Sequence, residues 1–230
     1  MMSVATPCRF SQLLREKIAF VSVKPLEGVT IWDDPRLSSF YPDLLFVGHC
    51  IIRASVPLMQ AALRTVGASN SDDPVGIALV NYFSHHILEE MDHDHWLLQD
   101  LAELGVTSKQ VLARMPPASV AQLVGSQYYW ILHHDPVALL GYIAVLEGSP
   151  LSQPELERAI STSGIPQTAF RTLMKHAMLD PHHRDDLDVV LDSLPLTAAQ
   201  ANLVGSSAIL TTALLDNAFA EVLPPDLCGR

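Results

Sequence analysis

The sequence predicts an all-α protein, a bundle of about seven helices. From Leu44 onward apolar residues recur three or four positions apart, as they do along the buried face of a helix, and no later segment alternates as a strand would. Capping residues, glycines and prolines separate these periodic segments. With 230 residues, 49% of them apolar and 17% charged, the chain is long enough to bury one large core.

The N-terminal part of the chain differs from the rest. Three prolines and one glycine interrupt the first forty residues, and long helical periodicity begins only after them. We therefore predict an irregular N-terminal arm over residues 1–43 and a helical domain over residues 44–230.

The helices are expected in the following order. The first should run from residue 44 to about residue 66, because Leu45, His49, Ile52 and Val56 share one helix face. A second is expected from Pro74 to Leu104, ending at a glycine. The remaining helices are expected at 108–113, at 119–147 with an interruption at Asp135-Pro136, and at 153–161, 166–179, 182–191 and 197–222 with Thr197 as its N-cap.

Composition excludes several classes of function. The net charge is −11, from 25 acidic and 14 basic residues, and no Lys/Arg run is present, which argues against a nucleic-acid partner. No uninterrupted apolar run is long enough to predict a membrane span, and no signal peptide is recognisable. The three cysteines are far apart, which is typical of a reducing cytoplasm. We expect a cytoplasmic protein that binds a small molecule, and the first helix could form a homodimer.

Histidines beside carboxylates are the main chemical signal. The chain has ten histidines, and the first cluster is HHILEEMDHDHW, residues 85–96. Glu90 lies three residues and Glu89 four residues before His93, so either carboxylate could share a helix face and a metal ion with that imidazole. A solvated polar helix face explains this cluster equally well.

Glu147 is the second signal. It follows the apolar run Tyr-Ile-Ala-Val-Leu, where an ionised carboxylate is costly unless it is paired or bound to a metal. A glutamate facing water at a helix end is the alternative, because a glycine follows it.

The third cluster is KHAMLDPHHRDD, residues 175–186. His176, Asp180 and His183 lie at i, i+4 and i+7, which is one stripe of an uninterrupted helix. Pro181 should kink or break that helix, which makes His182 a competitor, and an ordinary polar helix end is the alternative.

Together the clusters supply three carboxylates (Glu90, Glu147, Asp180) and three imidazoles (His93, His176, His183). Carboxylate and imidazole without thiolate suit iron or manganese, and helical bundles are where such sites are built. A single zinc ion would leave several of these residues unexplained, whereas two metal ions use them all.

In these stretches the sequence resembles the haem-oxygenase-like di-iron oxidases, a bacterial family of iron-containing redox enzymes. The similar segments are HHILEEMDHDHWLLQDLAELG (85–105), YYWILHHDPVALLGYIAVLEG (128–148) and FRTLMKHAMLDPHH (170–183). The resemblance spans roughly residues 44–222 and implies a haem-oxygenase-like bundle, the fold of TenA and of the cofactorless oxidase of pyrroloquinoline quinone synthesis.

The resemblance also implies a metal site and a reaction. The family's ligands correspond to Glu90, His93, Glu147, His176, Asp180 and His183. An upstream carboxylate found in some relatives is missing or replaced by His86, which makes His86 a further candidate, and Glu89 stays a possible ligand because of its spacing from His93. The implied cofactor is two Fe(II) ions, for which manganese could substitute, with O2 as cosubstrate. The implied enzyme is an iron-dependent oxidase or oxygenase of amino-acid-derived or fatty-acid-like substrates. Independently of the resemblance, Tyr142 is a candidate for the substrate pocket, because it lies about one and a half helical turns before Glu147.

Other functions share this fold, so fold alone does not decide. A haem oxygenase would need a proximal histidine, for which His49 is a candidate. A thiaminase-II-like hydrolase would need an activated cysteine, for which Cys50 is the candidate. A metal-free binding protein or a cofactorless enzyme is a further alternative.

Pro181 leads to a specific structural expectation. Without metal, the segment from about Leu179 to Asp186 should be distorted or swung away, because its polar stripe faces an apolar interior. Glu90, His93, Glu147 and His176 should converge nonetheless.

Overall fold

The computed structural model describes residues 9–22, 30–68, 72–148 and 151–227, and all regular secondary structure in these residues is helical, as predicted. The elements are, in order, α1 (Phe10–Val21), η1 (Ile31–Asp33), α2 (Leu37–Gly67), α3 (Pro74–Glu90), α4 (His93–Glu103), α5 (Ser108–Ala113), α6 (Ala118–His133), η2 (Pro136–Ala138), α7 (Leu139–Leu146), α8 (Gln153–Ser163), η3 (Gln167–Phe170), α9 (Arg171–Ser193) and α10 (Ala198–Ala220).

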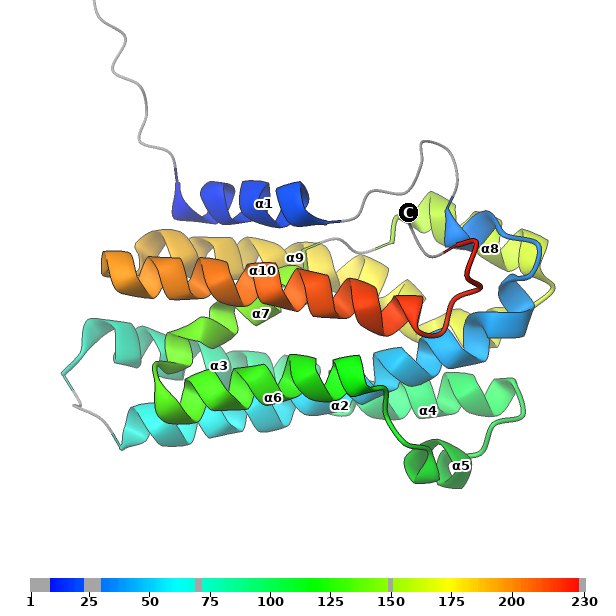
Figure 1. Cartoon of the computed structure of the whole chain (residues 1–230), viewed down its shortest axis with the longest axis horizontal. Helices are drawn as coiled ribbons and strands as arrows, with labels where there is room; N and C mark the ends of the chain where they lie inside the picture. The colour runs from blue at the N-terminus through cyan, green and yellow to red at the C-terminus, as the bar shows by residue number, and fades with distance from the viewer. Residues whose placement is uncertain (1–8, 23–29, 69–71, 149–150, 228–230) are drawn as a thin grey trace, which may run out of the picture.

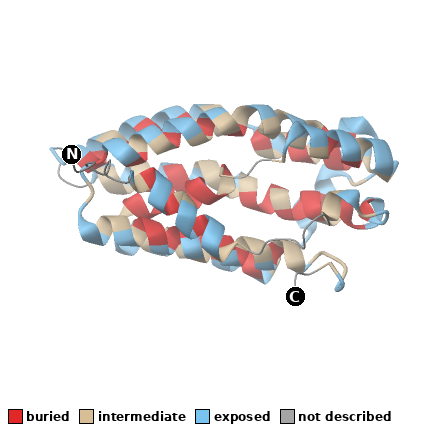
Figure 2. Ribbon diagram, turned by 90° about the horizontal axis from the view of Figure 1, so that it is seen from above, coloured by how far each residue is buried: buried red, intermediate tan, exposed pale blue. Residues whose placement is uncertain are grey.

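The long helices form two layers. The 31-residue α2 lies against α3, α4 and α6, while α9 and α10 form the opposite layer with α1 on its outer side (Figure 1). The short α7 lies between the layers and contacts α10, α9 and α2. Buried residues line the inner faces of these helices and exposed residues their outer faces (Figure 2).

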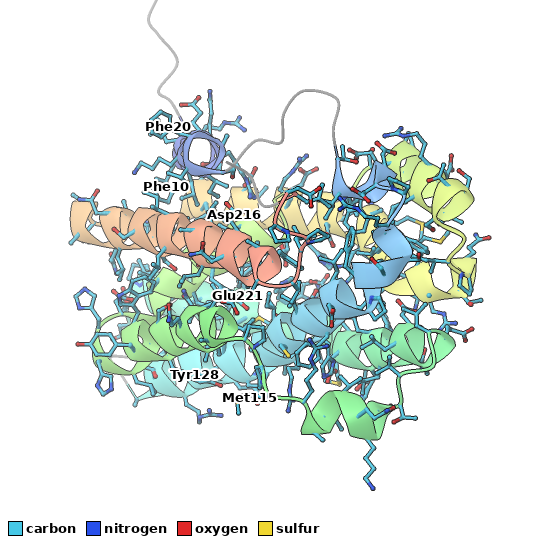
Figure 3. The ribbon with its side chains drawn as sticks, turned by 45° about the vertical axis from the view of Figure 1, so that its right-hand side comes forward. Phe10, Phe20, Met115, Tyr128, Asp216 and Glu221 are labelled. Carbon is cyan, nitrogen blue, oxygen red and sulfur yellow. The ribbon has the colours of Figure 1, made fainter. Side chains whose placement is uncertain are left out.

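The prediction of an irregular arm over residues 1–43 is wrong for two described segments. Residues 10–21 form α1, whose Leu14 and Ile18 are buried, and α2 begins at Leu37 rather than Leu44. Phe10, Leu14 and Ile18 are spaced as on one face of a helix. This pattern is short and has prolines on both sides, which is why we predicted an irregular segment. Phe10 packs against the core, whereas Phe20 is 89% exposed on α1 (Figure 3).

The single helix predicted over residues 74–104 is also wrong. It divides at Met91-Asp92 into α3 and α4, because Met91 is extended and Asp92 has φ 68°. Asp92 is the one non-glycine residue with positive φ in the described part of the chain. Asp is among the few L-residues that tolerate this left-handed conformation, so no glycine or proline marks the division.

Pro181 does not have the effect that we predicted. Instead of two helices with a distorted segment over Leu179–Asp186, α9 runs continuously from Arg171 to Ser193. Asp180 and His183 are already buried, at 6% and 5% exposure. A proline inside a helix costs one backbone hydrogen bond and some strain, and burial of Leu187 and Leu191 on the far side holds the helix together.

Two other expectations are confirmed. The helical segment 119–147 is interrupted where predicted, and the Asp135 side chain caps η2 by accepting a hydrogen bond from the Val137 amide at 2.9 Å. Thr197 is the N-cap of α10, and Gln200 completes a capping box with it.

The helices α2 and α10 are long and apolar enough to cross a membrane by length and composition alone. In α2, 61% of the most apolar window is buried inside the bundle, and in α10 39% is buried. Packing within the bundle accounts for much of this apolar character, most clearly in α2.

Close approaches between helices set the position of α7. A Cβ at Gly141 would collide with the backbone oxygen of Val204, so only glycine lets α7 lie this close to α10. Arg15 of α1 donates to the Ala144 carbonyl near the end of α7 at 2.5 Å and pairs with Asp188 of α9 at 2.7 Å. The C-terminal end of α7 is thereby tied to α9.

Asp100 anchors the start of α9. It is fully buried on α4, and its Oδ2 accepts a hydrogen bond from the Thr172 amide in the first turn of α9 at 2.8 Å. An acidic acceptor at a helix N-terminus satisfies a backbone donor that the helix leaves free. Asp100 therefore holds α9 against α4.

We predict that Asp100→Ala lowers the free energy of unfolding by about 1–2 kcal/mol, the usual cost of losing a helix cap, and that Asp100→Asn, which keeps an acceptor, lowers it less. Burial raises the pKa of Asp100, so the folded protein favours its protonated form more than the unfolded chain does. The wild-type stability relative to Asp100→Asn should therefore decline as the pH rises from about 4 toward 7. Urea denaturation of the three proteins at both pH values measures this, and equal losses in the two variants would contradict the capping role.

Candidate metal centre

Four helices bring the predicted ligands to one place in the interior. Glu90 is the last residue of α3, His93 is the first of α4, and Glu147 directly follows α7. The other three, His176, Asp180 and His183, project from α9. His93, Glu147, Asp180 and His183 are buried, and the Glu90 and His176 side chains are 9% and 18% exposed.

The division between α3 and α4 shapes the first part of the site. We had expected Glu90 and His93 to share the face of one helix. Instead Glu90 ends α3 and His93 begins α4, so the break between the two helices brings them together. Glu90 Oε2 lies 3.2 Å from His93 Nδ1, and Glu90 Oε1 lies 3.7 Å from His183 Nδ1. The two oxygens of one carboxylate thus face histidines from two different helices.

A second group of contacts surrounds His176. Its Nδ1 lies 2.8 Å from Asp180 Oδ1, one turn further along α9. Its ring meets the His93 ring edge-on, with centroids 5.0 Å apart. His93, Glu90, His176 and Asp180 therefore lie next to one another.

A third group centres on Glu147. Glu147 Oε1 lies 2.5 Å from His86 Nε2, and the His86 ring meets the His183 ring edge-on at 5.2 Å. One nitrogen or oxygen from each of His86, Glu147 and His183 lies within 4.8 Å of the other two, and all three residues are buried. This spacing is compatible with three ligands of one metal ion.

Several polar atoms in this cluster have no hydrogen-bond partner. They are Glu147 Oε2 and His176 Nε2, together with His93 Nδ1 and His183 Nδ1, which lie near the Glu90 carboxylate without forming a hydrogen bond to it, and all four are buried. Burying a polar atom without a hydrogen bond lowers the stability of the fold by about 1–3 kcal/mol. Four such atoms in one cluster are typical of a site that binds a ligand. Imidazole nitrogens and carboxylate oxygens without thiolates are a donor set that fits iron or manganese. The residues therefore fit the metal ions that the sequence predicts.

The electrostatics of the cluster follow from burial and charge sharing. Burial raises the pKa of Glu147. Burial lowers the pKa of His86, but contacts with Glu147 and Glu90 outweigh it and raise the pKa to about 9. Burial likewise opposes ionisation of Glu90, but its contact with His93 outweighs it and lowers the pKa of that carboxyl. Imidazoles and carboxylates thus share protons here, and a metal ion would have to displace some of them.

The two further candidates occupy different places. His86 is 3% exposed and lies in the cluster. Glu89 lies at its edge, with its side chain 29% exposed, and pairs with His86 Nδ1 at 3.1 Å and with the exposed His85 at 3.3 Å. Glu89 therefore supports His86 from the edge of the site.

Some residues around the site escaped the sequence analysis. Tyr82 stacks on His86, with ring centroids 5.3 Å apart, and Trp96 packs on His93 at 3.9 Å. Tyr82 lies four residues before His86 and Trp96 three residues after His93, so helical spacing alone could have predicted both contacts. Asp100 left no such signal, because its partner Thr172 lies on a distant segment of the chain.

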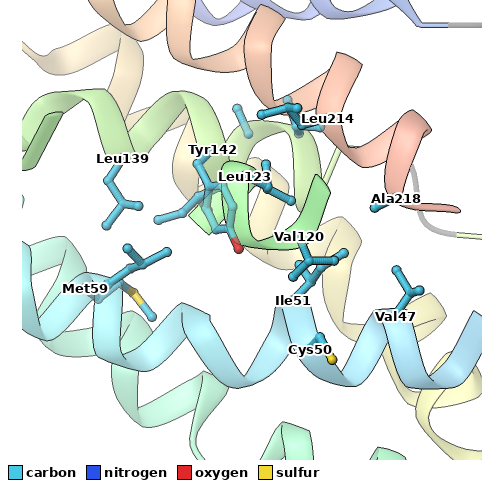
Figure 4. Packing of buried hydrophobic residues seen from close by; sticks show 14 of the residues in the cluster. Val47, Cys50, Ile51, Met59, Val120, Leu123, Leu139, Tyr142, Leu214 and Ala218 are labelled. Atoms are coloured by element: carbon cyan, nitrogen blue, oxygen red, sulfur yellow. The ribbon is translucent and has the colours of Figure 1, made fainter. Parts of the chain in front are cut away.

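An apolar cavity of about 330 Å³ adjoins the cluster. His86, Glu90, Glu147, His176 and Asp180 line its polar end. Leucine, isoleucine and aromatic side chains make up most of the remaining lining, and neither lysine nor arginine is among the described residues that line it. Tyr142 lines the cavity as well, and its hydroxyl points toward α2 (Figure 4).

The residues of the alternative functions lie elsewhere. Neither His49 nor Cys50 lines the cavity. His49 is buried with Nδ1 3.2 Å from the Asp94 carbonyl, and Cys50 packs in the core beside Val47 and Ile51 (Figure 4). Burial raises the pKa of the Cys50 thiol, the opposite of what activates a nucleophile.

Solved structures share the fold of this chain. A TenA homolog from Pseudomonas syringae pv. tomato str. DC3000 superposes with a TM-score of 0.69 at 12% identity, over 93% of this chain and 91% of the other. A domain of unknown function with a haem oxygenase-like fold from Shewanella denitrificans OS217 gives 0.62 at 21% identity, over 94% of each chain. No curated protein matches the sequence.

The family comparison adds to the structural one. A family model described as iron-containing redox enzyme matches residues 58–214, which is most of the chain and includes every predicted ligand. With the superpositions, this confirms the haem-oxygenase-like helical fold. The chain belongs to the iron-containing redox enzyme family.

Proposed function

We propose that the protein is a non-haem di-iron oxidoreductase that uses O2 to oxidise a small, mainly apolar organic substrate. The observation that carries this proposal is the buried cluster of carboxylates and imidazoles, four of whose atoms lack partners, at the polar end of an apolar cavity. Membership of an iron-containing redox family supports it.

The residues divide into two groups that could each hold an ion. His93, His176 and Asp180 are on one side, and Glu147 and His183 are on the other. Glu90 lies between them, with one oxygen toward His93 and the other toward His183, so it is placed to bridge. Three carboxylates would balance most of the charge of two divalent ions.

When bound, iron would supply the electrons that activate O2. The protein's own residues orient and shield the reaction. The apolar cavity wall excludes water and has few groups that could hydrogen-bond a substrate, so a polar head is best accommodated at the end lined by the ligands. Tyr142, 1% exposed, closes part of the wall.

The cavity also favours one of the two expected substrate classes. A charged amino-acid side chain would need a buried partner of opposite charge, and the acidic residues of the lining all belong to the proposed metal site. A fatty-acid-like chain needs only apolar contact along the wall, with its carboxylate at the polar end. We therefore propose the fatty-acid-like class.

The metal site is tested by anaerobic Fe(II) titration with measurement of bound iron. We expect the wild-type protein to bind two equivalents and Glu90→Ala to bind both at least tenfold more weakly, because the bridging carboxylate is lost. His95→Ala is the matched control, since its side chain is 61% exposed near the same helix division. Uptake of fewer than two equivalents by the wild type would refute the di-iron proposal.

The substrate class is tested by calorimetry with decanoate and L-lysine on iron-loaded, anaerobic protein. We expect decanoate to bind and lysine not to bind. Gly48 lines the cavity, and a Cβ there would lie 3.8 Å from Leu97 Cδ1, so Gly48→Leu should fill the cavity and weaken decanoate binding at least tenfold without loss of iron. Gly125→Leu on the exposed face of α6 is the control. Binding of lysine in preference to decanoate would reverse the assignment.

The reactivity of Cys50 distinguishes the proposed function from the hydrolase alternative, which would need an activated thiol at this position. Because burial raises the pKa of its thiol, we expect Cys50 in the native protein to resist iodoacetamide at pH 8 and to react only after unfolding in urea. Mass spectrometry of the peptide that contains Cys50 measures the modification. Rapid native alkylation, accompanied by loss of a hydrolytic activity, would favour the thiaminase-like function instead.

A further inference from the structure

Beside the six predicted ligands lies one more buried imidazole, that of His86, which the sequence offered only as a further candidate. His86 lies in the last two turns of α3 and is 3% exposed. Its ring stacks on Tyr82 with 13° between the ring planes and meets His183 edge-on. These packing contacts fix the plane of the ring, so both ring nitrogens have defined directions.

The two nitrogens face different kinds of group. Nε2 points into the cluster and lies 2.5 Å from Glu147 Oε1. Nδ1 points toward the edge of the site and lies 3.1 Å from Glu89 Oε2. A carboxylate that accepts the Nδ1 proton leaves Nε2 to present its lone pair, which is how carboxylates orient histidines that bind metals.

The surroundings of Nε2 contain unused ligand atoms. Glu147 Oε2 and His183 Nδ1 are buried and form no hydrogen bond, and His86, Glu147 and His183 each offer an atom within 4.8 Å of the other two. Without His86, this side of the site would have only Glu147, His183 and the shared carboxylate of Glu90. The opposite side has two imidazoles, an aspartate and the same Glu90.

We propose that His86 is a seventh metal ligand, which binds through Nε2 and completes the ion site of Glu147 and His183, and that Glu89 is its positioning residue. This inference rests on the proposed di-iron function. It makes the site richer in nitrogen than six ligands would, with four imidazoles and three carboxylates. The competing role for His86 is that of a hydrogen-bond donor to Glu147 with no contact to metal.

The test is anaerobic Fe(II) titration, with bound iron measured directly and the two environments resolved by Mössbauer spectroscopy of iron-57. His86→Phe keeps a ring that can stack on Tyr82 but has no nitrogen, so the fold should be preserved, which thermal unfolding of the metal-free protein verifies. We expect His86→Phe to retain one ion at wild-type affinity and to bind the second at least 100-fold more weakly, with loss of one quadrupole doublet.

Two further variants separate ligation from general disturbance. His85→Ala removes the adjacent histidine, which also contacts Glu89 but has a side chain that is 70% exposed, and it should bind both ions like the wild type. Glu89→Gln should weaken only the second ion, by about 10-fold to 100-fold, as loss of an orienting partner does.

The outcomes also separate this inference from the function on which it rests. If the wild type binds two ions and His86→Phe binds both within threefold of the wild type, His86 is not a ligand although the di-iron proposal stands. If the wild type binds a single ion that His86→Phe loses, His86 is a ligand and the di-iron proposal fails. If the wild type binds no Fe(II), both fail.

Discussion

The structure depends on burying polar side chains that the protein itself does not satisfy. An apolar bundle gains stability by removing water from its core, yet here carboxylates and imidazoles from α3, α4, α7 and α9 meet inside it. Four of their atoms have no hydrogen-bond partner. Such an arrangement persists only if the rest of the fold supplies the stability, and the extensive core around α2 and α10 does so.

Sharing of protons between imidazoles and carboxylates offsets part of the cost of burying this cluster. Imidazoles stand next to carboxylates in every group of the cluster: His86 with Glu147, His93 with Glu90, and His176 with Asp180. Each pair can hold its charge locally, so no isolated ion is buried. Once the shared protons are lost, the carboxylates of these three pairs present a charge of −3, which would offset most of the +4 of two divalent ions.

The sequence predicted the fold better than the details of its helices. Periodicity placed α5, α6, α8 and α10 well and α2 except for its first turns, and residue type and spacing, together with the family resemblance, singled out the six side chains that converge. The division at Asp92 was missed because an aspartate with positive φ leaves no glycine or proline to mark it. The continuity of α9 through Pro181 was missed because the packing beyond it outweighs one lost hydrogen bond. These errors share a cause, since local sequence rules do not contain the tertiary contacts that override them.

The sequence is equally unable to show which of the adjacent histidines His85 and His86 belongs to the candidate site. Along α3 the two have the same chemistry, and only the fold distinguishes them, because one side chain is 70% exposed and the other 3%. The approach of Glu147 from α7 gives His86 its partner, and that approach depends on Gly141, which lets α7 lie against α10, and on Arg15, which holds the end of α7. A residue without a side chain and a residue on the outermost helix thus help place the carboxylate that His86 meets in the candidate metal site. The chemistry of the site is therefore set by packing between helices as much as by the ligands themselves.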